Sequence, residues 1–323
     1  KSPLDAVVGE SKDDVEDFII RPAFLPIILA SKDKYSGDRV KLLGENSDQI
    51  STSLTNFLQN IFRKKTFRED QLKSIISILR GNDTVILLPT GAGKSFIYQL
   101  AGMLLPGITV VIDPIVSLMD DQVEGLKVYG IDRIVAIYSG TNTLKSDIKR
   151  IAQGEYQFVF QSPERLQIQD YKVAIRELAQ SNLINLAVID EAHCVSEWGH
   201  DFRPAYLNVS RNLRNLGRDS NKKPPVITAL TGTASRSVLR DVVTDLEIDV
   251  EDEDSLIRPD SFDRKELKFF LIKTDGPSFA ETDLKGVLSS LPNRFNIPQQ
   301  EFYRENGFNT YSGIVFTPFV GKG

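Results

Sequence analysis

The chain of 323 residues is 41% hydrophobic and 26% charged, and its formal net charge is −5 at pH 7. This composition is typical of a globular protein with enough length for one large domain or two ordinary ones. The single cysteine, Cys194, excludes a disulfide framework or a cysteine-based zinc cluster within this stretch, and neither a signal-peptide pattern nor a membrane-spanning apolar run occurs. We therefore predict an intracellular protein without a membrane contact.

Residues 1–50 form an N-terminal extension to which we assign no function. After it, apolar residues recur twice at helical spacing, at positions 50, 54, 57, 58, 61 and 62 and at positions 72, 75, 76 and 79. The second stripe ends at Gly81, a residue type that often follows a helix. Both stripes predict helices whose apolar face packs on a core.

From residue 83 onward, short apolar runs rich in β-branched residues alternate with helix-compatible segments such as 96–105 and 236–246. The runs cover residues 84–88, 108–112, 134–138, 158–160, 186–189 and 226–230. This alternation is typical of βαβ units, in which a parallel sheet is covered by helices on both faces. The predicted fold class is therefore α/β.

An acidic run at residues 249–254 interrupts the alternation, and we interpret it as an interdomain linker. The predicted first domain therefore covers residues 51–248. Strand-like runs reappear at residues 267–272 and 313–316, but residues 249–323 are few for a linker and a complete domain. We predict that this part holds the linker and only the start of a second domain.

Basic residues gather in three places despite the acidic net charge. They lie at residues 63–65, at positions 211, 214, 218, 222 and 223, and at positions 264, 265 and 268. Nucleic-acid-binding domains often carry a clear basic excess, which this chain lacks as a whole. Taken alone, each basic group is interpreted as a solvated surface face rather than as a phosphate contact.

A glycine-bearing turn stands between the strand predicted at 84–88 and the helical segment at 96–105. Its sequence, Pro-Thr-Gly-Ala-Gly-Lys-Ser at residues 89–95, would aim backbone N–H groups and the positive end of a helix at phosphate. Lys94 can reach the β- and γ-phosphates of a nucleotide, and the Ser95 hydroxyl can bind Mg²⁺. The strict phosphate-loop pattern has a glycine where this chain has Leu88. The predicted nucleotide-binding residues of this variant loop are Thr90, Gly91, Ala92, Gly93, Lys94 and Ser95.

Two acidic residues, Asp190 and Glu191, directly follow the strand predicted at 186–189. Asp190 can hold Mg²⁺ through water, and Glu191 can orient and deprotonate an attacking water molecule. Such a pair is commonly surface charge when it stands alone. Together with the loop at Lys94, it indicates hydrolysis of a nucleoside triphosphate.

The residues around this pair resemble a known family. Asp190-Glu191-Ala192-His193 is a DEAH box, and Pro-Thr-Gly-x-Gly-Lys-Ser is the helicase form of the phosphate loop. Residues 194–206, Cys-Val-Ser-Glu-Trp-Gly-His-Asp-Phe-Arg-Pro-Ala-Tyr, resemble the aromatic-rich loop of the RecQ helicases of superfamily 2. Such a loop offers aromatic faces on which unpaired bases can stack, with an arginine beside them. The resemblance implies catalytic roles for Lys94, Asp190, Glu191 and His193 and nucleic-acid contacts for Trp198, His200, Phe202 and Arg203.

Other segments are similar to further motifs of this family. Residues 67–71 resemble the motif whose glutamine reads the adenine edge, which implies that Gln71 selects ATP and that Phe67 and Arg68 frame the base. Residues 113–123 and 162–166 resemble the next two motifs, and the first implies backbone contacts to DNA from Ser117 and Gln122. Residues 231–235 resemble the motif that couples hydrolysis to strand movement, which implies this role for Thr231 and Thr233.

The resemblance covers residues 66–246 and implies a RecA-like P-loop domain followed by an incomplete second RecA-like domain. It implies ATP and Mg²⁺ as cofactors, single-stranded DNA and duplex junctions as partners, and 3′–5′ unwinding in the nucleus or the bacterial cytoplasm. Repair, recombination and defence against foreign DNA are the roles expected of such an enzyme. Residues 313–318 resemble the first strand motif of the second domain, but no arginine motif that reaches across the cleft is found. We therefore expect this chain to bind ATP and to hydrolyse it poorly, and we expect no zinc.

Two other interpretations remain open at this point. The chain could belong to an RNA helicase or to a translocase that moves along a duplex without separating it, since base stacking tolerates either sugar. It could also be a scaffold that a bound nucleotide switches on or off without hydrolysis. Small-molecule kinases share the phosphate loop but do not account for residues 198–203.

Overall fold

The computed structural model describes residues 47–68, 70–89, 91–105, 107–138, 144–180, 184–196, 205–218, 225–232, 235–250, 254–259, 271, 273 and 280–305. The chain divides into two compact units, Lys1–Phe262 and Asp263–Gly323. The sheet and the candidate site both belong to the first unit.

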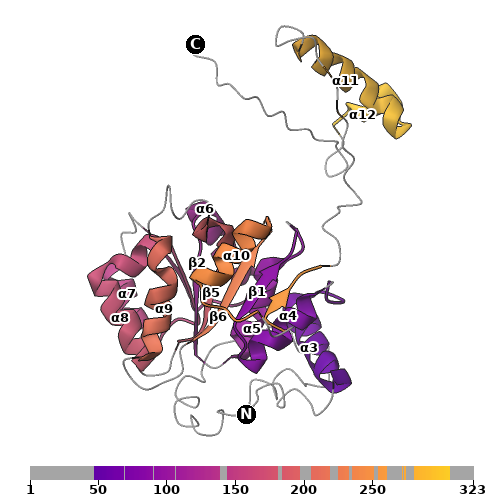
Figure 1. Ribbon diagram of the computed structural model, residues 1–323. Coiled ribbons are helices and arrows are strands. Elements are labelled where there is room, and N and C mark those ends of the chain that lie inside the picture. The colour runs from indigo at the N-terminus through magenta and orange to yellow at the C-terminus, as the bar shows by residue number, and fades with distance from the viewer. Residues whose placement is uncertain are drawn as a thin grey trace. The chain divides into compact units, whose positions relative to one another are not determined.

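A parallel seven-stranded sheet forms the centre of the described part of the first unit (Figure 1). Its strands are β1 (Thr84–Leu87), β2 (Ile108–Ile112), β3 (Ile134–Ile137), β4 (Phe158–Gln161), β5 (Ile184–Ile189), β6 (Val226–Thr231) and β7 (Leu256–Ile257). Their spatial order is β3-β4-β2-β5-β6-β1-β7, and every neighbouring pair is parallel. The six runs predicted as strands between residues 84 and 230 all lie in this sheet, so the predicted α/β class is confirmed.

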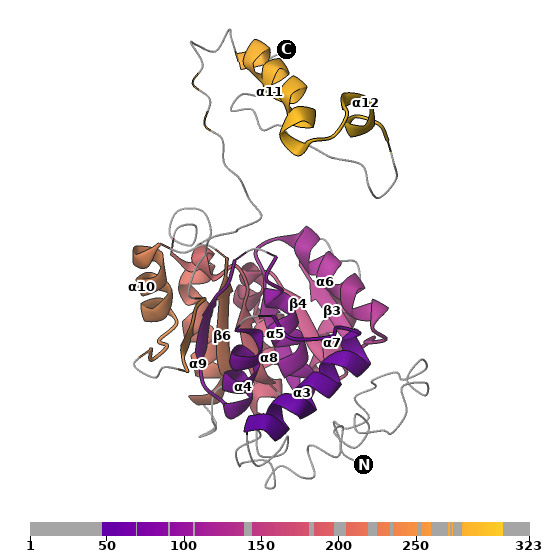
Figure 2. The same ribbon diagram turned by 90° about the vertical axis from the view of Figure 1, so that its right-hand side faces the viewer.

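Helices cover both faces of the sheet (Figures 1 and 2). One face carries α3 (Ser47–Phe62), α4 (Gln71–Arg80), α5 (Lys94–Leu104) and α6 (Val116–Val128). The other carries α7 (Leu144–Ala152), α8 (Gln169–Gln180), α9 (Val209–Arg218) and α10 (Arg236–Asp245). The connecting segments contain the short 3₁₀ helices η4 (Pro163–Gln167), η5 (Ala192–Val195) and η6 (Tyr206–Asn208). The predicted stripe on α3 is buried, and the stripe on α4 is buried at Ile75 and Leu79 and partly buried at Leu72 and Ile76.

Alternate residues of the central strands pack on opposite helical layers. In β1, Ile86 belongs to the core on the side of α3 to α6, whereas Val85 belongs to the core on the side of α7 to α10. In β2, Val111 faces the first layer, and Val110 and Ile112 face the second. Because both faces are buried, the strands are apolar at nearly every position, and the sequence shows continuous apolar runs.

Residues 254–257 belong to the first unit, beyond the domain boundary that the sequence predicts at residue 248. β7 pairs in parallel with β1. Asp254 is held on α4, since its backbone oxygen accepts a hydrogen bond from the Ser77 hydroxyl at 2.7 Å and its carboxylate lies 3.2 Å from the Arg80 guanidinium. The end of the acidic run is therefore docked on the first domain. A two-residue strand is too short to give a periodic signal in the sequence.

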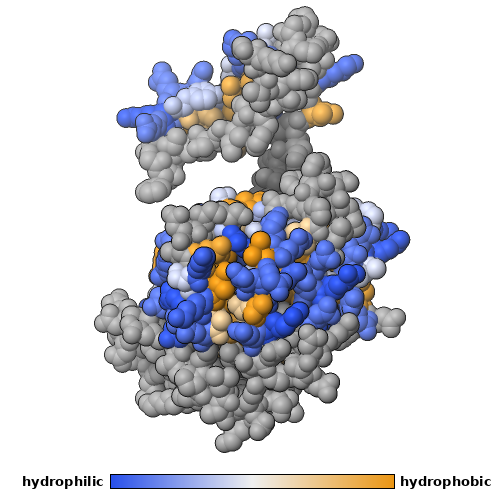
Figure 3. Space-filling model, turned by 90° about the vertical axis from the view of Figure 1, so that its left-hand side faces the viewer, coloured by the Kyte–Doolittle hydropathy of each residue, from blue (hydrophilic) through white to orange (hydrophobic). Residues whose placement is uncertain are grey.

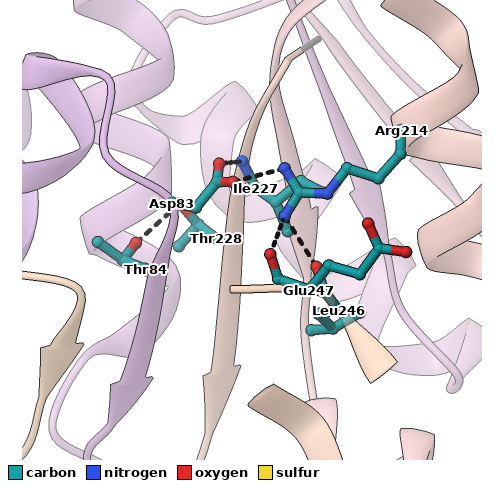
Figure 4. Close-up of polar contacts among 7 residues, drawn as sticks. All are labelled: Asp83, Thr84, Arg214, Ile227, Thr228, Leu246 and Glu247. Carbon is teal, nitrogen blue, oxygen red and sulfur yellow. Dashed lines mark hydrogen bonds and ion pairs between the residues drawn. The ribbon is translucent and has the colours of Figure 1, made fainter. Parts of the chain in front are cut away.

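Arg214 on α9 is enclosed in a polar cluster at the amino ends of β1 and β6 (Figure 4). Its guanidinium lies 2.5 Å from the Asp83 carboxylate and donates to the backbone oxygens of Leu246 and Glu247 at 2.8 and 3.0 Å. The same carboxylate accepts a hydrogen bond from the backbone N–H of Ile227 at 2.7 Å. The Arg214 side chain is only 12% exposed, so the interpretation of its basic group as solvated surface is wrong for this residue.

The surface on the side of α7 and α8 is mostly hydrophilic, with hydrophobic residues interspersed (Figure 3). Val173 on α8 is 43% exposed, and Ile168, immediately before this helix, is 45% exposed. Single exposed apolar residues of this kind are ordinary on protein surfaces. Among the helices in the described residues, none combines the length and the apolar character that crossing a bilayer requires.

In the second unit, the described residues form α11 (Ala280–Phe295) and α12 (Gln299–Phe302). The Phe295 and Phe302 rings stack with their centroids 5.7 Å apart. The strands predicted at 267–272 and 313–316 fall almost wholly outside the described residues, so a second RecA-like domain stays a prediction. Most of the N-terminal extension also lies outside them.

Candidate nucleotide-binding and hydrolysis site

Four neighbouring strands bring the predicted site residues to one edge of the sheet. The strands β2, β5, β6 and β1 are adjacent in space. Their carboxyl ends hold Asp113, Asp190, Thr231 and the phosphate loop, in that order. Parallel α/β sheets bind ligands at this edge, where helix amino ends also gather. Residues that are far apart in the sequence can therefore act on one ligand.

A cavity of about 430 Å³ lies at this edge, within the range of volumes that small-molecule sites have. Most of the predicted nucleotide-binding and catalytic side chains line it. The lining residues are Lys64, Thr66, Arg68, Gln71, Gly91, Gly93, Lys94, Ser95, Phe96, Asp113, Leu118, Gln122, Asp190 and Glu191. Asp113 is a lining residue without a predicted role, although its place directly after a buried strand is a signal for this edge of the sheet.

The phosphate loop turns sharply at two glycines. Gly91 and Gly93 have φ angles of 82° and 78°, a left-handed conformation that glycine adopts without strain. The backbone N–H of Ala92 donates to the oxygen of Pro89 at 3.0 Å, which closes the turn. The helix α5 begins at Lys94, so its amino end and the Lys94 side chain both belong to the cavity. This is the geometry that binds phosphate.

Gln71 is buried and joins the predicted adenine motif to the phosphate loop. Its side-chain amide donates to the backbone oxygens of Ala92 at 2.8 Å and Gly93 at 3.3 Å, and its oxygen accepts from the Arg68 N–H at 2.8 Å. The Arg68 guanidinium in turn donates to the Gly91 oxygen. A Cβ at Gly93 would lie 2.7 Å from the Gln71 nitrogen, so only glycine leaves room for this contact.

The Asp190 carboxyl is buried at the end of β5. Burial raises its pKa to about 6, even though one of its oxygens accepts a hydrogen bond from the Glu191 backbone N–H at 2.9 Å. Mg²⁺ prefers hard oxygen ligands, and both the Asp190 carboxyl and the Ser95 hydroxyl line this cavity. The residues present therefore fit the predicted Mg²⁺ ion.

Glu191, His193 and Thr231 form a chain of contacts beside Asp190. His193 Nδ1 lies 3.3 Å from a carboxylate oxygen of Glu191 and 3.1 Å from the hydroxyl oxygen of Thr231. The hydrogen bond with His193 lowers the pKa of Glu191. Hydrogen bonds to the side chain of Cys194 and to Glu191 raise the pKa of His193 to about 10. At neutral pH, Glu191 is therefore a carboxylate, the state that a general base needs.

The two residues predicted to contact DNA from α6 lie in different surroundings. Ser117 is exposed in the first turn of α6. The side chain of Gln122 is half-buried in the cavity, where it donates to the Ser95 hydroxyl at 3.1 Å. Six further predicted residues lie outside the described part of the chain, namely Thr90, Trp198, His200, Phe202, Arg203 and Thr233.

Comparison with known families matches residues 68–242 to the DEAD/DEAH box helicases. The chain belongs to this family. The phosphate loop, the DEAH box and Thr231 all lie within the matched residues of this DEAD/DEAH box helicase.

Several curated relatives of this DEAD/DEAH box helicase carry DNA helicase names. The chain is 42% identical over 197 residues to the probable ATP-dependent DNA helicase RecS of Bacillus subtilis, which covers 61% of the chain and 38% of that protein. It is 35% identical over 222 residues to the ATP-dependent DNA helicase RecQ of Bacillus subtilis, a match that covers 68% of the chain and 35% of that protein. It is 34% identical over 283 residues to the ATP-dependent helicase wrn-1 of Caenorhabditis elegans, a match that covers 81% of the chain and 26% of that protein.

These similarities confirm the RecQ resemblance found in the sequence. The chain spans less than two fifths of the length of each of these three relatives.

Proposed function

We propose that this chain is the ATP-hydrolysing motor part of a DNA helicase of the RecQ kind. The observation that carries the proposal is one cavity that holds both the phosphate loop with Lys94 and Ser95 and the acidic pair Asp190 and Glu191. Membership of the DEAD/DEAH box helicases and the names of the relatives support DNA as the polymer on which it acts.

In this proposal, the loop amides and the amino end of α5 bind the phosphates of ATP, and Lys94 neutralises their charge. Ser95 and Asp190 hold Mg²⁺, which when bound neutralises charge on the β- and γ-phosphates. Glu191 accepts a proton from the water that attacks the γ-phosphorus, and ADP leaves. The adenine is bound by Gln71, Phe67 and Arg68. For this, the side-chain amide of Gln71 gives up its hydrogen bonds to the phosphate loop and forms hydrogen bonds to the base.

The proposed DNA contacts are Ser117 on α6 and the aromatic-rich loop with Trp198, His200, Phe202 and Arg203. Because this loop follows the DEAH box directly, binding of a strand there would act on Glu191 and His193. Thr231 and Thr233 would couple ATP hydrolysis to movement of the DNA strand. We further propose that the motor moves with 3′–5′ polarity and unwinds duplex junctions. Its proposed role is in repair, recombination or defence against foreign DNA.

The test is Mg²⁺-dependent ATP turnover by this chain, and by any longer natural form of it, with and without single-stranded DNA. Because this sequence holds no arginine motif that reaches across the cleft, we expect single-stranded DNA to stimulate turnover strongly in a longer form and little in this chain. Glu191→Gln should lower turnover by about 10²- to 10⁴-fold and leave ATP binding intact, because only the base is lost. Lys94→Ala should weaken ATP binding by about ten- to hundred-fold, since a charged contact to phosphate is lost. The matched control is Lys127→Ala on the surface of α6, which should change neither quantity.

Three other results would each contradict the proposal in a different way. Equal stimulation by RNA would favour an RNA helicase. Stimulation by duplex DNA without strand separation would favour a duplex translocase. ATP binding with no response of turnover to any nucleic acid, both in this chain and in a longer form, would favour a nucleotide-switched scaffold.

A further inference from the structure

Gln122 bridges two residues of a neighbouring helix at the nucleotide cavity. Its side-chain oxygen accepts a hydrogen bond from the amide of Gln99 at 2.8 Å, and its own amide donates to the Ser95 hydroxyl oxygen at 3.1 Å. Ser95 and Gln99 are four residues apart on α5 and therefore lie on the same face of this helix. Gln99 is buried, at 8% exposure. The orientation of the Gln122 amide is thus fixed from α5.

This contact determines which parts of the Ser95 hydroxyl stay available. A serine hydroxyl has one hydrogen to donate and two lone pairs that accept. The amide of Gln122 uses one lone pair, which leaves the other for a cation. Because Gln99 donates to the oxygen of Gln122, the NH₂ group of Gln122 is the one that faces Ser95.

The helix that carries Gln122 also carries Ser117, five residues earlier in its exposed first turn. Five residues of α-helix correspond to about 7.5 Å along the axis. Between and beyond them, Met119 and Leu126 are fully buried and fix α6 on the core. Because Ser117 and Gln122 lie on one continuous helix, a small sliding of α6 on the core would displace both residues together.

We propose that Gln122 is a positioning residue of the metal site and not a DNA contact. It holds the Ser95 hydroxyl in the orientation that binds Mg²⁺, and α6 transmits nucleic-acid binding at Ser117 to that hydroxyl. The contacts of Gln122 with Ser95 and Gln99 are observed, whereas the Mg²⁺ ion at Ser95 and the transmission along α6 rest on the proposed function.

The first experiment measures the affinity of a fluorescent ATP analogue in Mg²⁺ and in EDTA. Gln122→Ala and the near-isosteric Gln122→Met should weaken binding in Mg²⁺ by about three- to ten-fold, the effect of one hydrogen bond, and leave binding in EDTA unchanged. Gln99→Ala should act in the same direction and more weakly, because it removes only the support of Gln122. The control is Glu124→Ala, an exposed residue of α6 that pairs with Lys127 and should change neither affinity. Thermal denaturation establishes that each variant is folded.

A double-mutant cycle with Ser95→Ala tests whether Gln122 acts through Ser95. In the Ser95→Ala background, Gln122→Met should have no further effect on affinity in Mg²⁺, since the group that it positions is absent. A full additional loss there would overturn the inference, as would equal losses in Mg²⁺ and in EDTA.

The second experiment measures the affinity for single-stranded DNA in the absence of nucleotide, by the fluorescence polarisation of a labelled strand. It distinguishes a failure of this inference from a failure of the proposed function. Gln122→Met should leave DNA affinity unchanged and abolish the increase in Mg²⁺-dependent nucleotide affinity that we expect DNA to cause in the wild type. Weaker DNA binding with unchanged nucleotide binding would make Gln122 a DNA contact and overturn the inference. A wild-type chain that binds ATP equally in Mg²⁺ and in EDTA would instead overturn the metal site of the proposed function itself.

Discussion

His193 Nδ1 lies 3.1 Å from the Thr231 hydroxyl oxygen and thereby joins the carboxyl end of β6 to the DEAH box that follows β5. The same nitrogen lies 3.3 Å from the Glu191 carboxylate. The proposed general base is thus two contacts away from the motif that we predict to couple hydrolysis to movement. Thr231 is fully buried, so its hydroxyl faces protein groups and not bulk water.

We expect Thr231→Val to uncouple ATP turnover from nucleic acid. Valine keeps the shape of threonine and removes the hydroxyl beside His193. ATP binding should stay unchanged, and turnover in the presence of single-stranded DNA should fall by about ten-fold, a usual size for coupling between sites. Thr231→Ser restores the hydroxyl and should restore most of the stimulation. Equal stimulation in the valine variant and in the wild type would show that this contact carries no coupling.

The sequence predicts the strands and both halves of the nucleotide site because their signals are local. The buried strands are continuous apolar runs, and the loop at 89–95 and the DEAH box are short segments whose chemistry can be recognised residue by residue. That Lys94 and Asp190 meet in one cavity follows from the parallel sheet, in which successive carboxyl ends share an edge.

Contacts of long polar side chains were not predictable in the same way. Arg214 and Asp83 are 131 positions apart, and neither neighbourhood in the sequence indicates the pair. Gln122 lies in a motif that predicts a DNA contact, yet its amide reaches Ser95, 27 positions earlier. Where such a side chain ends depends on how two helices pack, and helical periodicity fixes only the face from which it starts.

We expect Mg²⁺ affinity to depend on the protonation of Asp190. Burial raises the pKa of this carboxyl to about 6, so the metal-free folded protein takes up a proton there as the pH falls through that value. Mg²⁺ needs the carboxylate and must displace the proton. Below about pH 6, the Mg²⁺ concentration for half-maximal nucleotide binding should therefore rise by up to about ten-fold per pH unit, and above it this dependence should vanish.

Titrations of Mg²⁺ against a fluorescent ATP analogue at pH values on either side of 6 measure this dependence. ATP itself also takes up a proton in acid, so Asp190→Asn is the control. This variant should bind Mg²⁺ weakly at every pH and retain only the dependence that comes from the nucleotide. If the wild type and the variant show the same pH dependence, Asp190 is not the titrating group.

The polar cluster around Arg214 should contribute strongly to stability (Figure 4). Arg214→Met keeps the aliphatic stem and leaves the Asp83 carboxylate and two backbone oxygens without the guanidinium. We expect the free energy of unfolding to fall by about 2–3 kcal/mol, because a largely buried charge loses its partner. The control is Arg211→Ala, at an exposed position of the same helix, which should change stability by less than about 0.5 kcal/mol. Urea denaturation of both variants makes the comparison, and equal losses would contradict the prediction.

Two helix glycines should respond in opposite ways to alanine. Gly102 on α5 lies against the sheet, where a Cβ would meet the Thr109 hydroxyl and come within 2.9 Å of the Phe158 ring. Both neighbours are fully buried and have little room to move. Although alanine favours helix by about 1 kcal/mol over glycine, the overpacking of about 1–3 kcal/mol should outweigh this gain. We therefore expect Gly102→Ala to destabilise the protein.

Gly125 on α6 provides the matched comparison. A Cβ there would meet nothing within 4 Å, and the residue is exposed. Gly125→Ala should therefore show only the gain in helix propensity, a stabilisation of up to about 1 kcal/mol. Thermal or urea denaturation of the two variants gives the sign of each change. Stabilisation by Gly102→Ala would mean that α5 can move away from β2 and β4 at little cost. The close approach of this helix to the sheet would then not be what requires glycine at this position.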